Sequence, residues 1–310
     1  MIWMALAVAA SAGAMGQGDL VINELLYQPR SGEAEYVELY NRGEGAVELS
    51  EYHIVRWIGD SLGRHYALPE HSVAAHDYVV LTRNAASVAA CYHVGSLLKV
   101  VECALPTYPN DGGSVVLTTA DSVLVDRLDY GPEMQSRLLR NKAGVAIERR
   151  STTRATNEEG NWFSASSTCG YGTPGYANSQ STELLAEESA FEFSSTLLSP
   201  DGDGYEDALA IEYRMEDGAL AARVDVYDGQ GVAVRRLLNG GLLGTHGRME
   251  WDGRDEEGRQ VGQGQYVVRI VLYDTGGTRQ EIRRTVAVIT PPSGNRYLYN
   301  INDVGVKSTF

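Results

Sequence analysis

The chain has 310 residues, of which 43% are hydrophobic and 22% charged, so it can form two domains with apolar cores and is not disordered. Its formal net charge of -15 at pH 7 repels phosphate backbones and anionic lipid headgroups, which excludes nucleic acid and membrane surfaces as expected partners. The 34 glycines and 18 tyrosines favour short strands and tight turns.

Residues 1–18 are expected to form a signal peptide. Met1 to Ala14 are small or apolar without a charge, and residues 12–14 (Ala-Gly-Ala) suit a signal peptidase. This run is too short to cross a bilayer as a helix, and no cysteine follows it that could carry a lipid anchor. Because the first basic residue is Arg30, the positive start of a signal is missing, and an apolar first strand is the alternative. We therefore expect an exported protein of the periplasm, the outer membrane or the cell surface.

From Asp19 onward the side chains alternate with period two, which is typical of strands. One face of the first strand is expected to hold Val21, Asn23, Leu25 and Tyr27, while Ile22, Glu24 and Leu26 form the other. Further strands are predicted at 37–40, 52–58, 78–82, 114–119, 122–130 and 144–149, and a short helix at 85–90 after the capping Asn84. Turn signals between these runs predict an antiparallel sandwich or barrel.

Four blocks in residues 19–179 resemble the bacterial lamin-tail domain. They are Leu-Val-Ile-Asn-Glu-Leu-Leu-Tyr at 20–27, Glu-Tyr-Val-Glu-Leu-Tyr-Asn at 35–41, Tyr-Val-Val-Leu-Thr-Arg-Asn at 78–84, and Asn-Trp-Phe-Ser at 161–164 with Gly-Thr-Pro-Gly-Tyr-Ala-Asn at 172–178. The resemblance implies an immunoglobulin-like β-sandwich that serves exported bacterial proteins as a non-catalytic accessory, sometimes beside nucleases or other hydrolases. It assigns Asn23 and Glu24 no chemistry, and we interpret both as turn and pairing residues.

Residues 180–192 are polar and acidic, and they are interpreted as a linker with a helical turn, or as the lead-in to the next strand. An acidic turn, Ser-Pro-Asp-Gly-Asp-Gly-Tyr-Glu-Asp at 199–207, follows. Asp201, Asp203 and Asp207, with Glu206 and the carbonyl of Tyr205 available, resemble the first half of a calcium loop, although the twelve-residue pattern ending in a bidentate Glu is absent. Two interpretations stay open: calcium ligands, or a turn in which the aspartates bond the local backbone.

Residues 193–290 are expected to form a second sandwich, with strands at 208–215, 222–227, 232–238, 266–273 and 282–289. The segment Trp-Asp-Gly at 251–253, the Asp-Gly positions that follow it and Gly-Gln-Tyr at 264–266 are similar to the immunoglobulin-like domain of the flagellar hook-capping protein FlgD. In that domain a block like 199–204 commonly comes first. The resemblance implies a FlgD-like module of exported proteins, including those of gliding and type IX-secreting bacteria, with Trp251 in the core and Tyr266 at the start of the return strand.

Residues 291–310 are interpreted as an extended C-terminal tail, which begins with Pro291 and Pro292. Apolar and polar residues alternate over 297–302, which suits a segment that adds to the edge of another sheet. We expect other envelope or outer-membrane proteins as partners, reached through residues 295–310; a frayed end is the alternative.

Signals for catalysis are weak. Gly59-Asp60-Ser61-Leu62-Gly63 matches a nucleophile elbow, but the flanking residues favour a hairpin turn. His71 and His76 match no familiar metal pair. Cysteines 91, 103 and 169 leave the pairing open: a bridge from Cys91 to Cys103, other connectivities or free thiols.

The sequence as a whole favours an all-β protein of two immunoglobulin-like antiparallel β-sandwich domains in tandem. The hypothesis for its function is a non-catalytic exported adaptor or structural binding protein of the cell envelope, part of or accessory to a secretion or gliding apparatus. A cell-surface adhesin or carbohydrate-binding accessory is the alternative, and a hydrolase is a weaker one. No cofactor other than calcium is implied.

Overall fold

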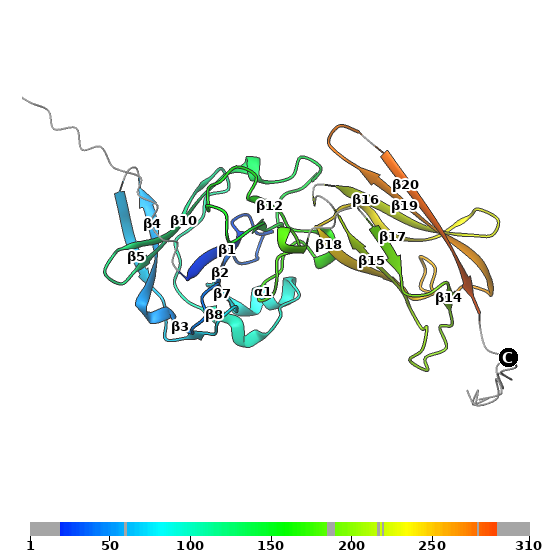
Figure 1. The fold of residues 1–310 in the computed structure, drawn as a ribbon, viewed down its shortest axis with the longest axis horizontal. Coiled ribbons are helices and arrows are strands. Elements are labelled where there is room, and N and C mark those ends of the chain that lie inside the picture. The colour runs from blue at the N-terminus through cyan, green and yellow to red at the C-terminus, as the bar shows by residue number, and fades with distance from the viewer. Residues whose placement is uncertain are drawn as a thin grey trace, which may run out of the picture.

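The computed structural model describes residues 19–58, 61–184, 190–215, 218, 220–277 and 279–289. The expected signal peptide at 1–18 and the expected tail at 291–310 lie outside the described residues. The described chain forms two β-rich bodies that follow one another along the long axis (Figure 1). This confirms the all-β class and the tandem arrangement expected from the sequence.

The first domain contains two sheets that pack face to face. A six-stranded sheet has the order β12-β11-β1-β2-β7-β8, a four-stranded sheet has the order β10-β9-β4-β5, and β3 pairs with β6. The elements in chain order are β1 (Leu20–Leu26), β2 (Tyr36–Asn41), β3 (Val47–Glu48), η1 (Leu49–Glu51), β4 (Tyr52–Ile58), β5 (Ser61–Ala67), β6 (Ser72–Val73), β7 (Tyr78–Thr82), α1 (Ala85–Cys91), η2 (Leu97–Lys99), β8 (Val100–Glu102), β9 (Gly113–Thr119), β10 (Leu124–Tyr130), η3 (Pro132–Met134), β11 (Ile147–Arg149), β12 (Trp162–Ser164), η4 (Ser167–Cys169) and η5 (Thr182–Leu184).

The six-stranded sheet is buried on both faces. Its inner face contributes Ile22, Leu25 and Ile147 to the main core, while Leu26 and Tyr36 pack on the other face against α1. The strict alternation expected for β1 is wrong, because a β-bulge between Ile22 and Glu24 shifts the register against β2. The bulge places both Ile22 and Leu25 in the main core.

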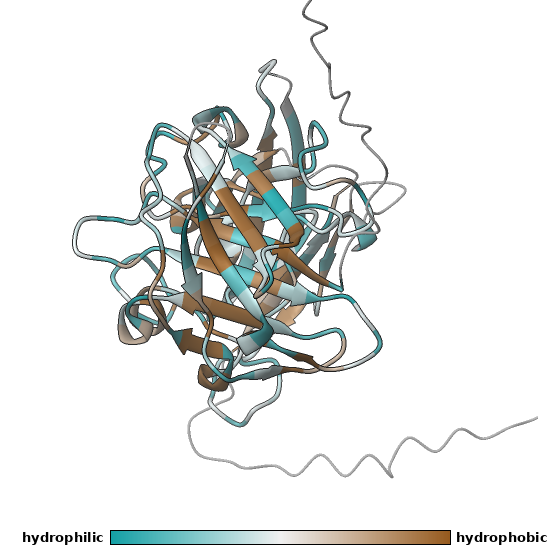
Figure 2. Ribbon diagram, turned by 90° about the vertical axis from the view of Figure 1, so that its left-hand side faces the viewer, coloured by the Kyte–Doolittle hydropathy of each residue, from teal (hydrophilic) through white to brown (hydrophobic). Residues whose placement is uncertain are grey.

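The second domain is a smaller sandwich of a three-stranded sheet, β13-β15-β18, and a five-stranded sheet, β14-β20-β19-β16-β17. Its strands are β13 (Ala190–Phe193), β14 (Leu197–Leu198), β15 (Leu209–Arg214), β16 (Ala221–Asp228), β17 (Ala233–Leu242), β18 (His246–Trp251), β19 (Gly264–Tyr273) and β20 (Arg279–Val288). Brown apolar segments lie mainly on strands and teal polar segments mainly on loops in Figure 2, as expected for cores built between sheets.

Trp251 is the largest side chain of this second core. It is fully buried at the end of β18, its Nε1 donates to the carbonyl of Arg254 at 3.0 Å, and its ring lies 5.3 Å from that of Tyr266. The structure thus gives both residues the core positions expected from the Trp-Asp-Gly and Gly-x-Tyr pattern.

Three details differ from the sequence-based picture. Two strand pairs, β7 with β8 and β14 with β20, run parallel within otherwise antiparallel sheets. Strand β18 was not predicted, because its sequence His-Gly-Arg-Met-Glu-Trp has only weak alternation. The proposed bridge from Cys91 to Cys103 is absent: both are free thiols, as is Cys169.

Candidate functional site

The acidic turn brings its three aspartates together. One carboxylate oxygen from each of Asp201, Asp203 and Asp207 lies within 4.8 Å of the other two. The chain can fold this tightly because Gly202 and Gly204 adopt φ of +83° and +90°, values that favour glycine. Sequence reasoning was therefore right to group these residues, whatever they bind.

Glu206 does not join the aspartates. Its carboxylate accepts a hydrogen bond from Ser195 Oγ at 2.8 Å, and its carbonyl accepts one from the amide of Ser199 at 2.8 Å. Glu206 instead ties the turn back onto the chain before it, so it is not among the carboxylates that could hold a cation here.

Backbone amides of the turn donate hydrogen bonds to some of its carboxylate oxygens. The carboxylate of Asp207 accepts from the amides of Gly202 at 2.6 Å and Gly204 at 2.7 Å, and these bonds hold its pKa below the usual range. Asp201 accepts from the amide of Asp203 at 3.1 Å. Each carboxylate keeps further lone pairs, so the geometry fits both a self-bonded turn and a calcium site completed by water or carbonyl oxygens.

A second acidic group, not anticipated from the sequence, lies inside the first domain. Glu24, Glu38 and Glu148 occupy neighbouring positions on β1, β2 and β11, and all three are 0% exposed. Burial, and then the charge of Glu148, raises the pKa of Glu24 to about 8; burial also raises the pKa of Glu38 and Glu148. The carboxyls lie on the outer face of the six-stranded sheet, and residues 172–180 cover them. We call this covering segment the clasp.

The hydroxyl of Thr173 in the clasp shows that the carboxyls share a proton. Its Oγ1 lies 2.9 Å from Glu24 Oε2 and 2.8 Å from Glu148 Oε1, yet a hydroxyl has only one hydrogen to donate. One of the two carboxyls must therefore donate in return. Glu24 Oε1 accepts from Tyr36 Oη at 2.6 Å, and the amide of Thr173 lies 3.0 Å from Oε1 and 3.2 Å from Oε2. Because the shorter of these bonds are to Oε1, Oε2 is the oxygen better placed to hold the proton.

The clasp continues directly into the contact between the domains. Glu148 Oε2 accepts from Ser179 Oγ at 2.8 Å and from the amide of Gln180 at 2.9 Å. The carbonyl of Ser179 then accepts from the amide of Thr245 at 2.9 Å, and Gln180 Nε2 donates to the carbonyl of Leu243 at 3.3 Å. Gln180, the first residue of the expected linker, is thus fully buried between the two domains.

A short helical turn of the first domain, η4, makes the other half of this contact. Ser167 Oγ donates to the carbonyl of Leu242 at 2.6 Å, and the hydroxyls of Thr168 and Tyr213 lie 2.7 Å apart. Tyr213 is 2% exposed, so its hydroxyl needs this partner. The interface is therefore built from hydroxyl, amide and carbonyl groups instead of ion pairs.

Glycines of the second domain allow the close approach. A Cβ at Gly241 would lie 2.4 Å from Ser167 Oγ, and one at Gly244 would lie 2.2 Å from the carbonyl oxygen of Ser179. One at Gly247 would lie 2.7 Å from Thr168 Oγ1 of the first domain and 2.3 Å from Tyr213 Oη, the partner of Thr168. Side chains at these positions would push the domains apart or displace their hydrogen-bond partners. Their spacing, every third residue, was the signal in the sequence that could have located the interface.

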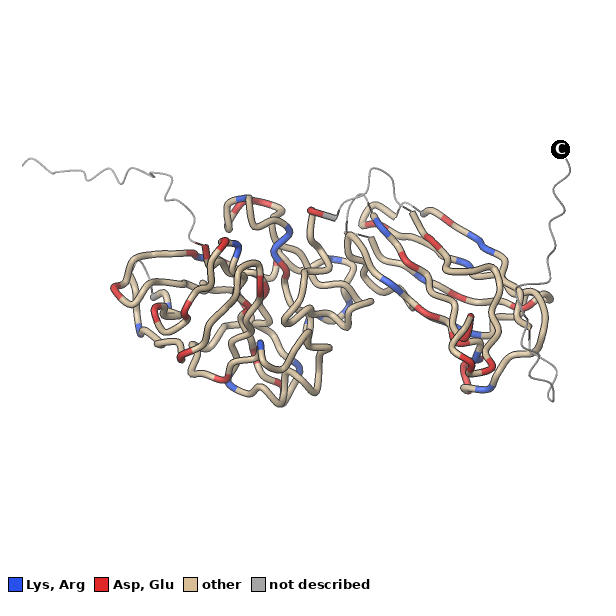
Figure 3. The backbone as a smooth tube through the Cα atoms, turned by 60° about the horizontal axis from the view of Figure 1, so that its bottom comes forward, with Lys and Arg blue, Asp and Glu red and all other residues tan. Residues whose placement is uncertain are grey.

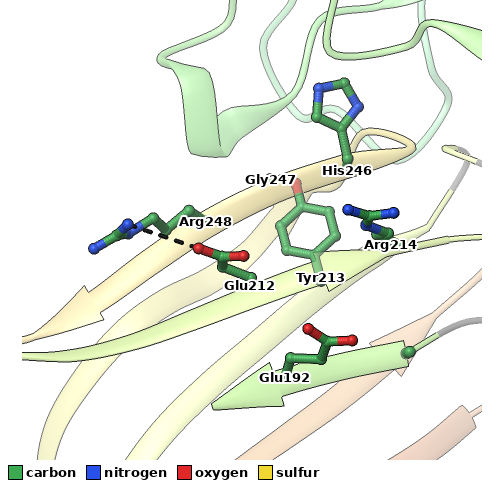
Figure 4. A pocket seen from close by; sticks show the side chains of 8 residues that line it. Glu192, Glu212, Tyr213, Arg214, His246, Gly247 and Arg248 are labelled. Atoms are coloured by element: carbon green, nitrogen blue, oxygen red, sulfur yellow. Dashed lines mark ion pairs between the residues drawn. The ribbon is translucent and has the colours of Figure 1, made fainter. Parts of the chain in front are cut away.

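A pocket of about 300 Å³ opens over the outer face of the three-stranded sheet (Figure 4). Glu192, Glu212, Arg214 and Arg248 line it together with His246, and Glu212 lies 3.7 Å from Arg248. Burial, and then the neighbouring Arg214, lowers the pKa of His246. Acidic and basic groups balance here, so the pocket has no preference for either sign of charge.

The two domains match known families in the order expected. Residues 14–132 match the Lamin Tail Domain, and residues 196–276 match the FlgD Ig-like domain. The chain joins a lamin tail domain to a FlgD Ig-like domain. No curated protein matches it.

Solved structures resemble parts of the chain at low scores. CopC from Methylosinus trichosporium OB3b is 16% identical over 29% of this chain and 81% of its own, with a TM-score of 0.21. FLGD from P. aeruginosa is 17% identical over 34% of this chain and 74% of its own, with a TM-score of 0.23. Dimeric latent PorU from Porphyromonas gingivalis is 10% identical over 88% of this chain and 34% of its own, with a TM-score of 0.27. At these scores the likeness bears on neither function nor partner.

Of the motif suggestive of a hydrolase, Gly59 and Asp60 lie outside the described residues, and residues 61–63 lie on β5 of the lamin tail domain. Ser61 begins β5, whose first residue pairs with the last residue of β4, Ile58, in an antiparallel ladder. A nucleophile elbow needs a strand followed by a helix, so this arrangement does not match one. His71 and His76 also stay apart from any group of three metal-ligating side chains within the described residues.

Proposed function

We propose that this protein is an exported, non-catalytic binding protein of the bacterial cell envelope that works as an adaptor or structural component of a secretion or gliding apparatus. The observation that carries the proposal is the buried, hydrogen-bonded contact between its two sandwiches. Such a contact holds the lamin tail domain and the FlgD Ig-like domain in one orientation, so that partners bound to each would be kept at a fixed spacing.

Several features support this role. Both domains are β-sandwiches, and the families that they match serve as binding modules. The outer faces and loops of the two sandwiches are the surfaces on which partners would bind. Within the described residues, no helix is long and apolar enough to span a membrane. Calcium at Asp201, Asp203 and Asp207 would stiffen the entrance to the FlgD Ig-like domain, which is a structural task and not a catalytic one.

The proposal is tested by affinity purification of the tagged chain from the native envelope, followed by mass spectrometry. We expect a defined set of envelope proteins to be recovered with the intact chain. Each domain expressed alone should recover only part of this set, because neither part fixes the spacing. Recovery of the same set by one domain alone would contradict the adaptor role.

A matched variant separates the role of the interface from that of the surfaces. Gly247→Ala places a methyl group against Tyr213 Oη, whereas Gly262→Ala adds one where no atom lies within 4 Å. The first variant should lose partners that need both domains, and the second should keep them all.

A further inference from the structure

A cleft of about 600 Å³ lies between the two domains, and its lining residues Asn239 and Gly240 come just before Leu242, which accepts a hydrogen bond from η4. The lamin tail domain contributes Arg30, Arg140 and Tyr171, and the FlgD Ig-like domain contributes Arg223 and Tyr273. Sites for small ligands commonly lie at domain junctions and have volumes in this range, so the cleft has the place and the size of a binding site.

The charge of the cleft is opposite to that of the protein. The whole chain has 41 acidic and 26 basic residues, and the positions of acidic residues, red in Figure 3, are spread over both domains. Among the described residues that line the cleft, three are arginines and none is Asp or Glu. An anion that the rest of the surface repels would therefore be attracted to this cleft.

Neighbouring acids anchor two of the arginines from outside the lining. Arg30 Nη1 lies 3.3 Å from Glu33 Oε1, and Arg223 Nε lies 2.6 Å from Asp225 Oδ2. Asp225 also pairs with Arg236 at 2.7 Å, so one carboxylate serves two guanidinium groups and a positive charge remains. Because each pair uses only part of the five N–H donors of a guanidinium, donors are left for a ligand.

Arg140 is the strongest candidate for direct contact. It is exposed at the cleft, and it makes no hydrogen bond or ion pair with any other described residue. An arginine in this position can bind a carboxylate through two parallel N–H bonds.

We propose that the cleft binds an acidic saccharide, whose carboxylate contacts Arg140 and Arg223. Tyrosine rings such as Tyr171 and Tyr273 suit the faces of sugar rings, and the amide of Asn239 in the lining suits their hydroxyl groups. This activity goes beyond the adaptor role and does not depend on it.

An extended acidic peptide fits the cleft less well. Peptides commonly bind by adding a strand to a free sheet edge. Arg223 lies on β16, which pairs with β17 on one side and β19 on the other. The carbonyl of Leu242 at the end of β17 is occupied by Ser167 Oγ of η4. Strand β17, whose Asn239 and Gly240 line the cleft, is the edge strand of this sheet, so a peptide could pair only along β17. The arginines lie on β16 and in the first domain instead, and the galacturonate and hexaglutamate arms of the test separate the two ligands.

The test is calorimetric titration of the full chain with tri-galacturonate, with galactotriose as the neutral match and hexaglutamate as the acidic peptide. We expect tri-galacturonate alone to bind, and its affinity to fall as sodium chloride is added. Arg140→Gln and Arg223→Gln should each weaken it about tenfold or more, as loss of a charge-assisted hydrogen bond does. Arg56→Gln, an exposed change on β4 of the lamin tail domain, should leave it unchanged.

Thermal melting shows that each variant is folded, so that a loss of binding reports on the cleft. Absence of binding by tri-galacturonate, or full binding by Arg140→Gln and Arg223→Gln, would overturn the proposal. Tighter binding of hexaglutamate than of the saccharide would overturn it too, and would assign the cleft to acidic peptides. The titration does not depend on envelope partners, so failure of the adaptor proposal in the affinity purification would leave the test of the cleft unaffected.

Discussion

Replacement of Glu24 by Gln tests the proton shared by the buried carboxyls. Glutamine has the size of a protonated glutamate, and its Oε1 can accept from Tyr36 and from the amide of Thr173 as Glu24 Oε1 does. Its Nε2 can then donate to Thr173 Oγ1, which is free to donate to Glu148. The variant keeps the hydrogen bonds of the neutral acid and has no proton to lose.

The magnitude follows from the pKa of Glu24, which rises from 4.5 to about 8 in the folded protein. A group whose folded pKa is raised contributes stability that is complete below the unfolded pKa and is lost as the pH rises through the folded pKa. Between pH 4.5 and 8 the native chain should therefore lose about 1.4 kcal/mol of unfolding free energy per pH unit, or about 5 kcal/mol in all. Glu38 and Glu148 shift in the same direction and add to the loss, so Glu24→Gln should remove only the part that Glu24 contributes.

Urea unfolding at half-unit steps from pH 5 to 9, followed by tyrosine and tryptophan fluorescence, measures this slope. We expect Glu24→Gln to be about as stable as the native chain near pH 5 and more stable at pH 8 and above. Glu70→Gln, at an exposed glutamate of the same domain, should keep the native slope. A native slope in Glu24→Gln as well would refute the assignment of a proton to this carboxyl.

Three further predictions concern other parts of the chain. If calcium binds the acidic turn, millimolar calcium should raise the melting temperature of the native chain but not that of Asp203→Ala, as measured by differential scanning fluorimetry. An equal response of the native chain and Asp203→Ala would contradict calcium binding at this turn. Gly247→Ala should cost about 1–3 kcal/mol in urea unfolding because its methyl group overlaps Tyr213 Oη, and a value near zero would mean that the interface yields easily. Trp251→Ala should cost about 3–5 kcal/mol in the same assay, since the ring is fully buried, and a loss below 1 kcal/mol would contradict its place in the core.

The sequence predicted the strands of both domains well where alternation was regular. The run at 78–82 matches β7, and Asn84 caps α1 as expected, with its side chain accepting from the amide of Ser87 at 3.0 Å. The grouping of the three aspartates was also predictable, because a turn of alternating glycines leaves their side chains little choice of direction.

The buried glutamates could not be located from the pattern alone. Glu24 sits on a strand whose two faces are both buried, and the bulge at Asn23 changes which face it occupies. Besides Tyr36 on the neighbouring strand, the clasp, more than 140 residues further along the chain, supplies donors that make its burial tolerable. Contacts between residues this far apart leave no trace in local periodicity.

The domain interface was hidden for a similar reason. Short polar residues such as Ser167, Thr168 and Ser179 resemble loop and linker composition, and their buried partners lie in another domain. The arginine cleft combines residues from several loops and from both domains, so no single stretch of sequence indicates it.

The contact of η4 with the end of β17 also has a consequence for solubility. Strand β17 lies at the edge of its sheet, and an uncovered edge can pair with the edge of another molecule. In the full chain Ser167 occupies the Leu242 carbonyl at the end of this edge, so the first domain removes one acceptor with which another molecule could pair. The second domain without the first would leave this carbonyl open, which gives a reason for the two domains to occur in one chain.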